Sequence, residues 1–286
     1  MTGQTYRELY EEGAAMLAAA GIPEARLDAR LLLEDVCGTD TQTLLAHGER
    51  PVSDSECARY EGVTARRAAR EPLAYIVGEQ EFMGIPFYVT PEVLIPNQDT
   101  EVLVEEAMRE LSGGMRILDL CTGSGCILLS LLRYSSGCSG VGTDLSEAAL
   151  AVAERNAERM ALSEQVEWRC GDLWDAVQPE LFDIIVSNPP YIPTAVIGTL
   201  APEVRSAEPY QALDGGEDGL VFYRRIIGEA ARHLRIGGKL FLEIGYDQSR
   251  AVTELLREAG FLEIETRQDY GGLDRVVRAE RGLKTK

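Results

Sequence analysis

Residues 116–125 read RILDLCTGSG, an apolar run that passes directly into a turn of small residues. The run predicts a buried strand, and the apolar residues from Cys126 to Tyr134 predict a helix after the turn. Small residues let the backbone of a turn approach a ligand, and the free N–H groups at the start of a helix point toward it. We therefore expect a ligand site where this strand ends.

The same alternation of strand and helix continues along the chain. Further strands are expected at residues 140–144, 166–169, 182–187, 239–244, 263–268 and 274–278, and further helices at 99–112, 146–160, 220–234 and 248–259. The strands lack polar alternation, as in Ile184-Ile185-Val186, which indicates a parallel sheet covered on both faces. The sequence thus predicts an α/β, Rossmann-like fold with a seven-stranded, mostly parallel sheet.

The N-terminal part of the chain has a different, helical pattern. One helix is expected after Thr5, with Glu8 completing a capping box, a second after Ile22-Pro23, and a third over about 53–70. Residues 73–98 then predict a β-hairpin, in which Tyr75-Ile76-Val77 is strand-like. We divide the chain into a helical domain (1–72), a hairpin linker (73–98) and an α/β domain (99–286).

Charge and cysteine usage narrow the functional classes. The 286 residues carry a formal net charge of -19, which argues against binding a polyanion such as nucleic acid. The nearest basic cluster, Arg66, Arg67 and Arg70, has helical spacing and is interpreted as a solvated face. The six cysteines form no paired metal-binding motif, and no leader or membrane-spanning run is visible. We expect a monomeric cytoplasmic protein with free thiols and no metal.

An acidic residue ends the strand expected after the glycine turn. Asp144 would lie at the carboxyl edge of the sheet, where ligands of parallel sheets collect. Its two oxygens can accept both hydroxyl protons of a ribose. The turn lacks the GxGxxG pattern of dinucleotide-binding proteins, so a different nucleotide-like ligand is favoured.

The strongest chemical motif is Ser187-Asn188-Pro189-Pro190-Tyr191, which follows the strand at 182–187. The prolines stop the strand, so the turn projects its polar groups at the same edge of the sheet. An amide NH₂ is a poor nucleophile with two N–H donors, and the Asn188 side-chain oxygen and the Pro189 carbonyl are two acceptors that a rigid turn can aim at them. Tyr191 offers a flat wall for a planar amide or base. This arrangement predicts a site that binds and orients the NH₂ group of an amide or an exocyclic amine without a metal or a strong base.

Several segments together carry a family resemblance. The glycine turn resembles the first motif of the class I methyltransferases. The residues at 70–82, 93–101, 212–220, 242–245 and 274–277 resemble the HemK/PrmC family, over a match from about Pro72 to Val277. The family consists of protein-(glutamine-N5) methyltransferases that act on peptide chain release factors. One mismatch is Asn97-Gln98, where the family commonly has Arg-Pro, so neither residue is assigned to the site.

The resemblance implies a cofactor, a substrate and a set of site residues. The cofactor would be S-adenosyl-L-methionine, with S-adenosyl-L-homocysteine as product, and the substrate the glutamine of a Gly-Gly-Gln loop, docked with the help of the helical domain. Asn188, Pro189, Pro190 and Tyr191 would bind that glutamine, with Asn188 also touching the cofactor. The cofactor pocket would comprise Asp119, Cys121, Thr122, Gly123, Ser124, Gly125, Asp144, Asp172 and Leu173. Among these, Asp119 would support the loop, Asp144 hold the ribose, and Asp172 and Leu173 lie beside the adenine.

Cys121 stands where the class I motif usually has its first glycine. A side chain held at a positive φ costs about 1–2 kcal/mol, so we expect an ordinary negative φ here. A reactive thiol is not expected, because no histidine is near in the sequence.

Two other functions fit parts of this pattern. Adenine-N6 methyltransferases of nucleic acid share the Asn-Pro-Pro-Tyr turn, because adenine presents the same kind of NH₂ group, but they require a basic groove and a base-reading domain. A non-catalytic adaptor that docks on release factors would not need an amide-orienting turn.

Overall fold

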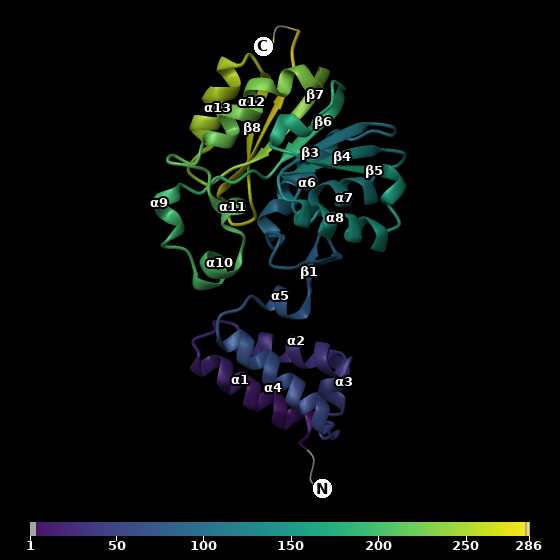
Figure 1. The fold of residues 1–286 in the computed structure, drawn as a ribbon, viewed down its shortest axis with the longest axis vertical. Helices are drawn as coiled ribbons and strands as arrows, with labels where there is room; N and C mark the ends of the chain where they lie inside the picture. The colour runs from purple at the N-terminus through teal and green to yellow at the C-terminus, as the bar shows by residue number, and fades with distance from the viewer. Residues whose placement is uncertain (1–3, 284, 286) are drawn as a thin grey trace. The chain divides into compact units, whose positions relative to one another are not determined.

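The computed structural model describes residues 4–283 and 285 (Figure 1). Contacts divide the chain into two compact units. One extends to Gly78 and includes residues 201–207, and the other comprises Glu79–Leu200 and Glu208–Lys286. The segment 201–207 therefore belongs with the helical unit, although its place in the sequence suggested the α/β domain.

The helical unit contains α1 (Tyr6–Ala19), α2 (Ala25–Cys37), α3 (Thr41–Ala46), α4 (Asp54–Ala68), α5 (Leu73–Val77) and α10 (Pro202–Ala207). The predicted capping box of Thr5 and Glu8 is present, and Ser53 and Glu56 form a second one. Apolar side chains of α1 and α2 fill the core together with Tyr60, whose hydroxyl donates to the Ala29 carbonyl at 3.1 Å. Helix α3 was not predicted.

Residues 75–77 are helical, so the prediction of a strand there is wrong. Helix α5 begins after Pro72 and ends at Gly78, which adopts a left-handed conformation at φ 76°. Its side chains Leu73, Ile76 and Val77 pack against the helical core. Packing against helices therefore overrides the strand preference of this short apolar run.

The interpretation of Arg66, Arg67 and Arg70 as a solvated face is also wrong. Arg67 is buried, and its Nε lies 2.7 Å from Asp28 Oδ2. Arg70 donates to the carbonyls of Ala20 and Gly21, both at 2.9 Å, and forms an ion pair with Glu203. Partners far away in the sequence thus bury Arg67 and partly cover Arg70 within the helical unit, whereas Arg66 stays exposed.

The α/β unit begins with a hairpin of β1 (Glu79–Phe82) and β2 (Ile85–Tyr88), followed by a seven-stranded sheet of order β5-β4-β3-β6-β7-β9-β8. The strands are β3 (Arg116–Leu120), β4 (Ser139–Asp144), β5 (Val166–Cys170), β6 (Phe182–Ser187), β7 (Leu234–Glu243), β8 (Leu262–Gln268) and β9 (Asp274–Glu280). Only β9 runs against its neighbours. The predicted seven-stranded, mostly parallel sheet is confirmed.

Helices cover both faces of this sheet (Figure 1). One core cluster contains side chains of α6 (Gln98–Glu110), α7 (Cys126–Arg133) and α8 (Glu147–Arg159). The other contains those of α12 (Val221–His233) and α13 (Ser249–Glu258). Neighbouring residues of β3 alternate between the two core clusters, since Ile117 belongs to the first and Leu118 to the second.

Short helical segments complete the unit: η1 (Ser163–Gln165), η2 (Leu173–Ala176), α9 (Thr194–Ile197) and α11 (Tyr210–Leu213). None of the helices within the described part of the chain has both the length and the apolar character needed to cross a bilayer.

The register of the central strands aligns their carboxyl ends. Leu120 of β3 pairs with Thr143 of β4 and with Ser187 of β6, and Ser187 pairs with Leu242 of β7. The residues that follow these four strand positions therefore meet at one edge of the sheet, which is where ligands of parallel sheets bind.

Candidate active site

A cavity of about 520 Å³ lies along this edge, within the α/β unit. Its wall includes segments 92–97, 121–124, 143–146, 171–173 and 209–212, together with Thr100, Asn188, Pro190 and Phe222. A volume of this size is in the range of small-molecule and cofactor sites.

The glycine turn adopts a conformation that corrects one prediction. Cys121 has a φ of 61°, not the negative value expected, and Gly123 and Gly125 are also left-handed. The reason is a reversal of the chain at the end of β3. The Thr122 amide must donate to the Thr143 carbonyl of the neighbouring strand at 2.9 Å, while the Thr122 hydroxyl returns to Asp119 Oδ2 at 2.6 Å. These contacts hold Cys121 in a conformation that a side chain disfavours.

Replacing Cys121 by glycine should therefore be tolerated. Relief of the left-handed strain, about 1–2 kcal/mol, opposes the larger chain entropy of glycine, about 0.5–1 kcal/mol. We expect the free energy of unfolding of the Cys121→Gly variant to stay within about 1 kcal/mol of the parent. Urea denaturation checks this. A markedly larger loss would mean that the thiol contributes packing that outweighs the strain.

Asp119 supports the turn from behind the cavity wall. Its side chain is fully buried, and burial raises the pKa of its carboxyl to about 7. One oxygen accepts a hydrogen bond from the Thr122 hydroxyl. The other, Oδ1, is buried and has no well-formed hydrogen bond to any described residue. Burial also raises the pKa of the Cys121 thiol. A thiol with a raised pKa gives no support to a nucleophilic role.

Asp144 lines the cavity at the end of β4. Its Oδ2 accepts from the Gly123 amide and its Oδ1 from the Ser146 amide, both at 2.9 Å. These two bonds fix the carboxylate and leave each oxygen able to accept a further hydrogen. Burial raises the pKa of Asp144.

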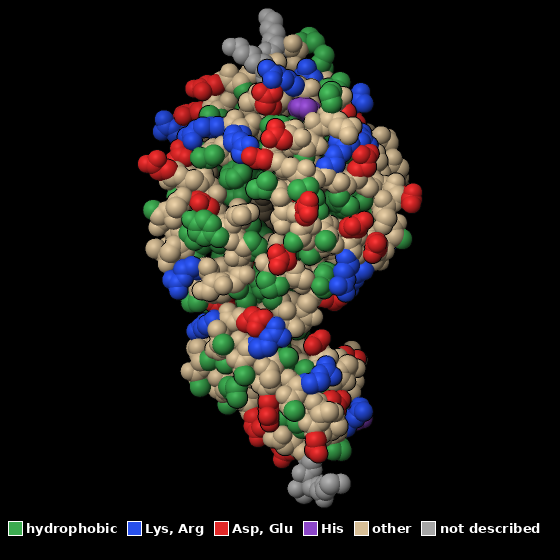
Figure 2. All heavy atoms as spheres, viewed as in Figure 1, with side chains coloured by type: hydrophobic (Ala, Val, Ile, Leu, Met, Phe, Trp, Pro, Cys, Tyr) green, Lys and Arg blue, Asp and Glu red, His purple; other side chains and the backbone are tan. Residues whose placement is uncertain are grey.

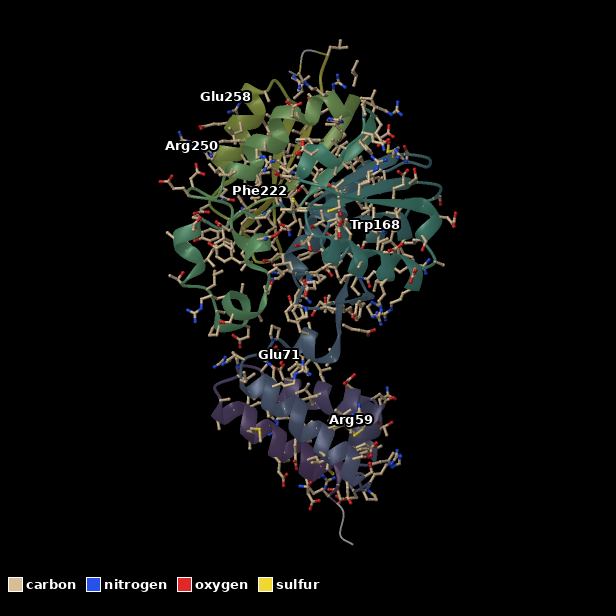
Figure 3. The ribbon with its side chains drawn as sticks, viewed as in Figure 1. Arg59, Glu71, Trp168, Phe222, Arg250 and Glu258 are labelled. Atoms are coloured by element: carbon tan, nitrogen blue, oxygen red, sulfur yellow. The ribbon has the colours of Figure 1, made fainter. Side chains whose placement is uncertain are left out.

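Asp172 and Leu173 line the same cavity, after β5. The Asp172 carboxylate forms an ion pair with Arg225 at 2.9 Å, and Leu173 is buried with a φ of 52°. Phe222, labelled in Figure 3, approaches the cavity from α12 and adds an aromatic surface to this wall.

The Asn-Pro-Pro-Tyr turn follows β6. Asn188 and Pro190 line the cavity, whereas Pro189 and Tyr191 are not part of its wall. The Asn188 Nδ2 donates to Thr100 Oγ1 at 3.3 Å, which turns its Oδ1 away from this bond. Tyr191 directs its hydroxyl to Glu243 Oε1 at 3.2 Å, behind the turn.

Sequence reasoning missed the residues that support this turn. Thr100 and Glu243 are both buried, and Arg275 is also buried, with its guanidinium bonded to Asp269 at 3.0–3.1 Å. Burial raises the pKa of Glu243 to about 7, while a hydrogen bond from Thr100 and the charge of Arg275 oppose that shift. All three residues belong to motifs quoted above, but the spacing of those motifs gives no sign that they meet.

Other parts of the wall were missed as well. Asn97, left out of the site by the sequence argument, lines the cavity and caps α6 by accepting from the Asp99 amide at 3.1 Å. Segment 209–212, most of which belongs to α11, was assigned no place in the site, although Ala212 begins one of the segments that carry the family resemblance.

The strand order, the glycine-rich turn after β3 and the carboxylate after β4 define a class I methyltransferase. A solved methyltransferase from Pyrococcus furiosus shares this fold, with a TM-score of 0.55 and 21% identity over 78% of this chain and all of that chain. Family models for the PrmC N-terminal domain and the methyltransferase small domain match residues 8–78 and 96–201.

Curated relatives are named release factor glutamine methyltransferase. One from Geobacter sulfurreducens is 45% identical, covering 96% of this chain and 95% of that protein. One from Moorella thermoacetica is 44% identical, covering 97% and 99%. The chain belongs to the release factor glutamine methyltransferase family.

Proposed function

We propose that this chain transfers a methyl group from S-adenosyl-L-methionine to the side-chain amide nitrogen of the glutamine in the Gly-Gly-Gln loop of peptide chain release factors. It would act as a cytoplasmic monomer in translation termination. One observation carries the proposal. Asn188, held by Thr100, lines the same cavity as the Asp144 carboxylate and the glycine turn.

The cavity fits the cofactor. A side chain at Gly125 would be strained, because an added Cβ would lie 3.0 Å from Trp168 and the residue is left-handed, so the glycine keeps the turn close to the sheet. Asp144 retains acceptor capacity for ribose hydroxyls. When bound, S-adenosylmethionine supplies an electrophilic methyl carbon on a positively charged sulfur. The buried Asp119 and Asp144 carboxyls, whose pKa values burial raises, would be returned toward the ionised form by such a cation.

The protein's contribution to the reaction is positioning. Asn188 Oδ1 and the Pro189 carbonyl would accept the two amide hydrogens of the glutamine and direct the nitrogen lone pair at the methyl carbon. The nitrogen held in this way would take the methyl group with its own lone pair, leaving the C–S bonding pair with the donor, and would then release one proton to water. The proposal therefore requires no strong base.

The charge distribution favours a protein substrate over nucleic acid. On the face drawn in Figure 2, Lys and Arg side chains stand among Asp and Glu side chains and form no continuous basic surface. The net charge of -19 would also repel a polyanion.

Incubation with methyl-labelled S-adenosylmethionine and a purified release factor tests the proposal. We expect mass spectrometry to find one added methyl group on the loop glutamine, and none on a release factor whose loop glutamine is replaced by alanine. Duplex DNA and RNA serve as competing substrates. Label in nucleic acid and none in protein would contradict the proposal.

A further inference from the structure

Three segments that are distant in sequence meet behind the Asn-Pro-Pro-Tyr turn: the start of α6 at Thr100, the end of β7 at Glu243, and the start of β9 at Arg275. Thr100 and Glu243 are each at most 3% exposed. The Glu243 Oε1 accepts a hydrogen bond from the Tyr191 hydroxyl. Its Oε2 is buried and has no well-formed hydrogen bond to any described residue. Such a carboxylate is costly to bury, so its position calls for a physical role.

The Thr100 hydroxyl links Glu243 to Asn188, and its chemistry sets the direction of the hydrogen bonds between them. An ionised carboxylate can only accept hydrogen bonds, and the Thr100 hydroxyl has a single proton. The Thr100 side chain is one of the groups that act on Glu243, whose Oε2 is buried without another partner, so we assign the hydroxyl proton to that oxygen. The lone pairs of the hydroxyl then face Asn188, and only the NH₂ end of the Asn188 amide can bind them, as it does at 3.3 Å.

We propose that Glu243 is a positioning residue, which acts through the Thr100 hydroxyl to fix which end of the Asn188 amide faces the cavity. With the NH₂ end held by Thr100, Oδ1 is left to accept from the substrate amide. This inference rests on the proposed function, because a different acceptor group would not need the oxygen end of Asn188.

A protonated Glu243 would reverse the direction of the hydrogen bonds that run through Thr100. It could donate to Thr100, Thr100 could then donate to Asn188 Oδ1, and the amide could turn its NH₂ end toward the substrate. The groups that face Glu243 are Tyr191 from the turn, Thr100 and Asp99 from α6, and Arg275 from β9, while Tyr223 of α12 donates to its backbone carbonyl at 2.8 Å. Burial raises the pKa of Glu243 to about 7. The carboxylate form is lost as the pH falls through this value, so kcat should fall with it.

Four variants test the proposal with the release factor as substrate. Thr100→Val removes the hydroxyl at nearly constant size and should lower kcat roughly 10–100-fold, as loss of a supporting hydrogen bond commonly does. Its KM for the release factor should change little. Thr100→Ser should recover most of the lost rate. Glu243→Gln can donate to Thr100 and should resemble Thr100→Val, and the double variant should be no slower than either single one.

Thr266→Val is the matched control. It removes a hydroxyl of β8 that is hydrogen-bonded to the Ser249 hydroxyl at 2.9 Å. The kcat of this variant should be unchanged. A merely structural role predicts a different pattern, with Thr100→Ser as slow as Thr100→Val, additive losses in the double variant, and an unaltered acidic limb in the pH profile of kcat. Any of these results would overturn the inference. Loss of that acidic limb in Thr100→Val would support it.

A measurement without substrate separates this inference from the proposed function. The NMR signals of the Asn188 side-chain amide should change as the pH falls through about 7 in the parent protein and stay constant in Glu243→Gln. If that change occurs but the parent protein fails to methylate release factor, the proposed function fails while the positioning role stands. If methylation occurs but the Asn188 signals do not respond to pH, the positioning role fails.

Discussion

Replacing Asn188 by alanine should lower kcat for release-factor methylation by roughly 10²-fold or more, while the affinity for S-adenosylmethionine falls far less. The alanine removes the side-chain oxygen that we expect to accept a hydrogen from the substrate amide. A factor of 10² corresponds to about 2.7 kcal/mol, the scale of one preorganised polar contact in a transition state. Single-turnover kinetics with a purified release factor would measure it.

The expectation follows from how rigidly Asn188 is held. It comes directly after the buried end of β6, where the Ser187 hydroxyl donates to the Leu120 carbonyl at 2.7 Å, and the two prolines behind it restrict the backbone. A side chain held in this way has little freedom to lose when the substrate binds. Most of the free energy of its hydrogen bond with the substrate can therefore lower the activation free energy of the reaction.

Asn97→Ala provides a matched comparison. Asn97 lines the same cavity, but its side-chain oxygen caps α6. Its loss should therefore lower the melting temperature and reduce kcat far less than the loss of Asn188. If Asn188→Ala retained a near-parental kcat, or if both variants lost rate equally, the acceptor role of Asn188 would be untenable.

The sheet and its ligand edge could be predicted from the sequence for a clear reason. The strands at 116–120 and 182–187 are mostly apolar, and both pass directly into turn residues, so strand type and strand end are encoded locally. Because parallel strands align their carboxyl ends, the residues after them were expected to gather, and Gly123, Asp144 and Asn188 line one cavity.

The remaining features depend on contacts between distant segments. Residues 75–77 have strand-like side chains but pack on a helical core, and Arg67 looks solvated until Asp28 is known to face it. Cys121 takes a positive φ because the neighbouring strand requires a hydrogen bond from Thr122. Local pattern carries no information about such partners, so the hydrogen bond between Asn188 and Thr100 was equally invisible.

Replacing Asp144 by alanine should weaken the affinity for S-adenosylmethionine by about 1.5–3 kcal/mol, the worth of hydrogen bonds to a charged group. This is roughly a 10–150-fold increase in Kd, which calorimetry can measure. The same substitution removes the acceptor for the Gly123 and Ser146 amides, so a loosened turn could also weaken binding. The two causes must be separated by the choice of ligand.

A ligand that lacks the ribose hydroxyls makes this separation. The parent protein should bind S-adenosylhomocysteine more tightly than its 2′,3′-dideoxy analogue, because the Asp144 oxygens keep acceptor capacity beyond their two backbone bonds. The Asp144→Ala variant should bind the two ligands about equally. Equal weakening of both ligands would instead assign Asp144 to support of the turn alone. Because burial raises the pKa of Asp144, the parent protein's preference should also fade as the pH drops through that raised value and the carboxylate is protonated.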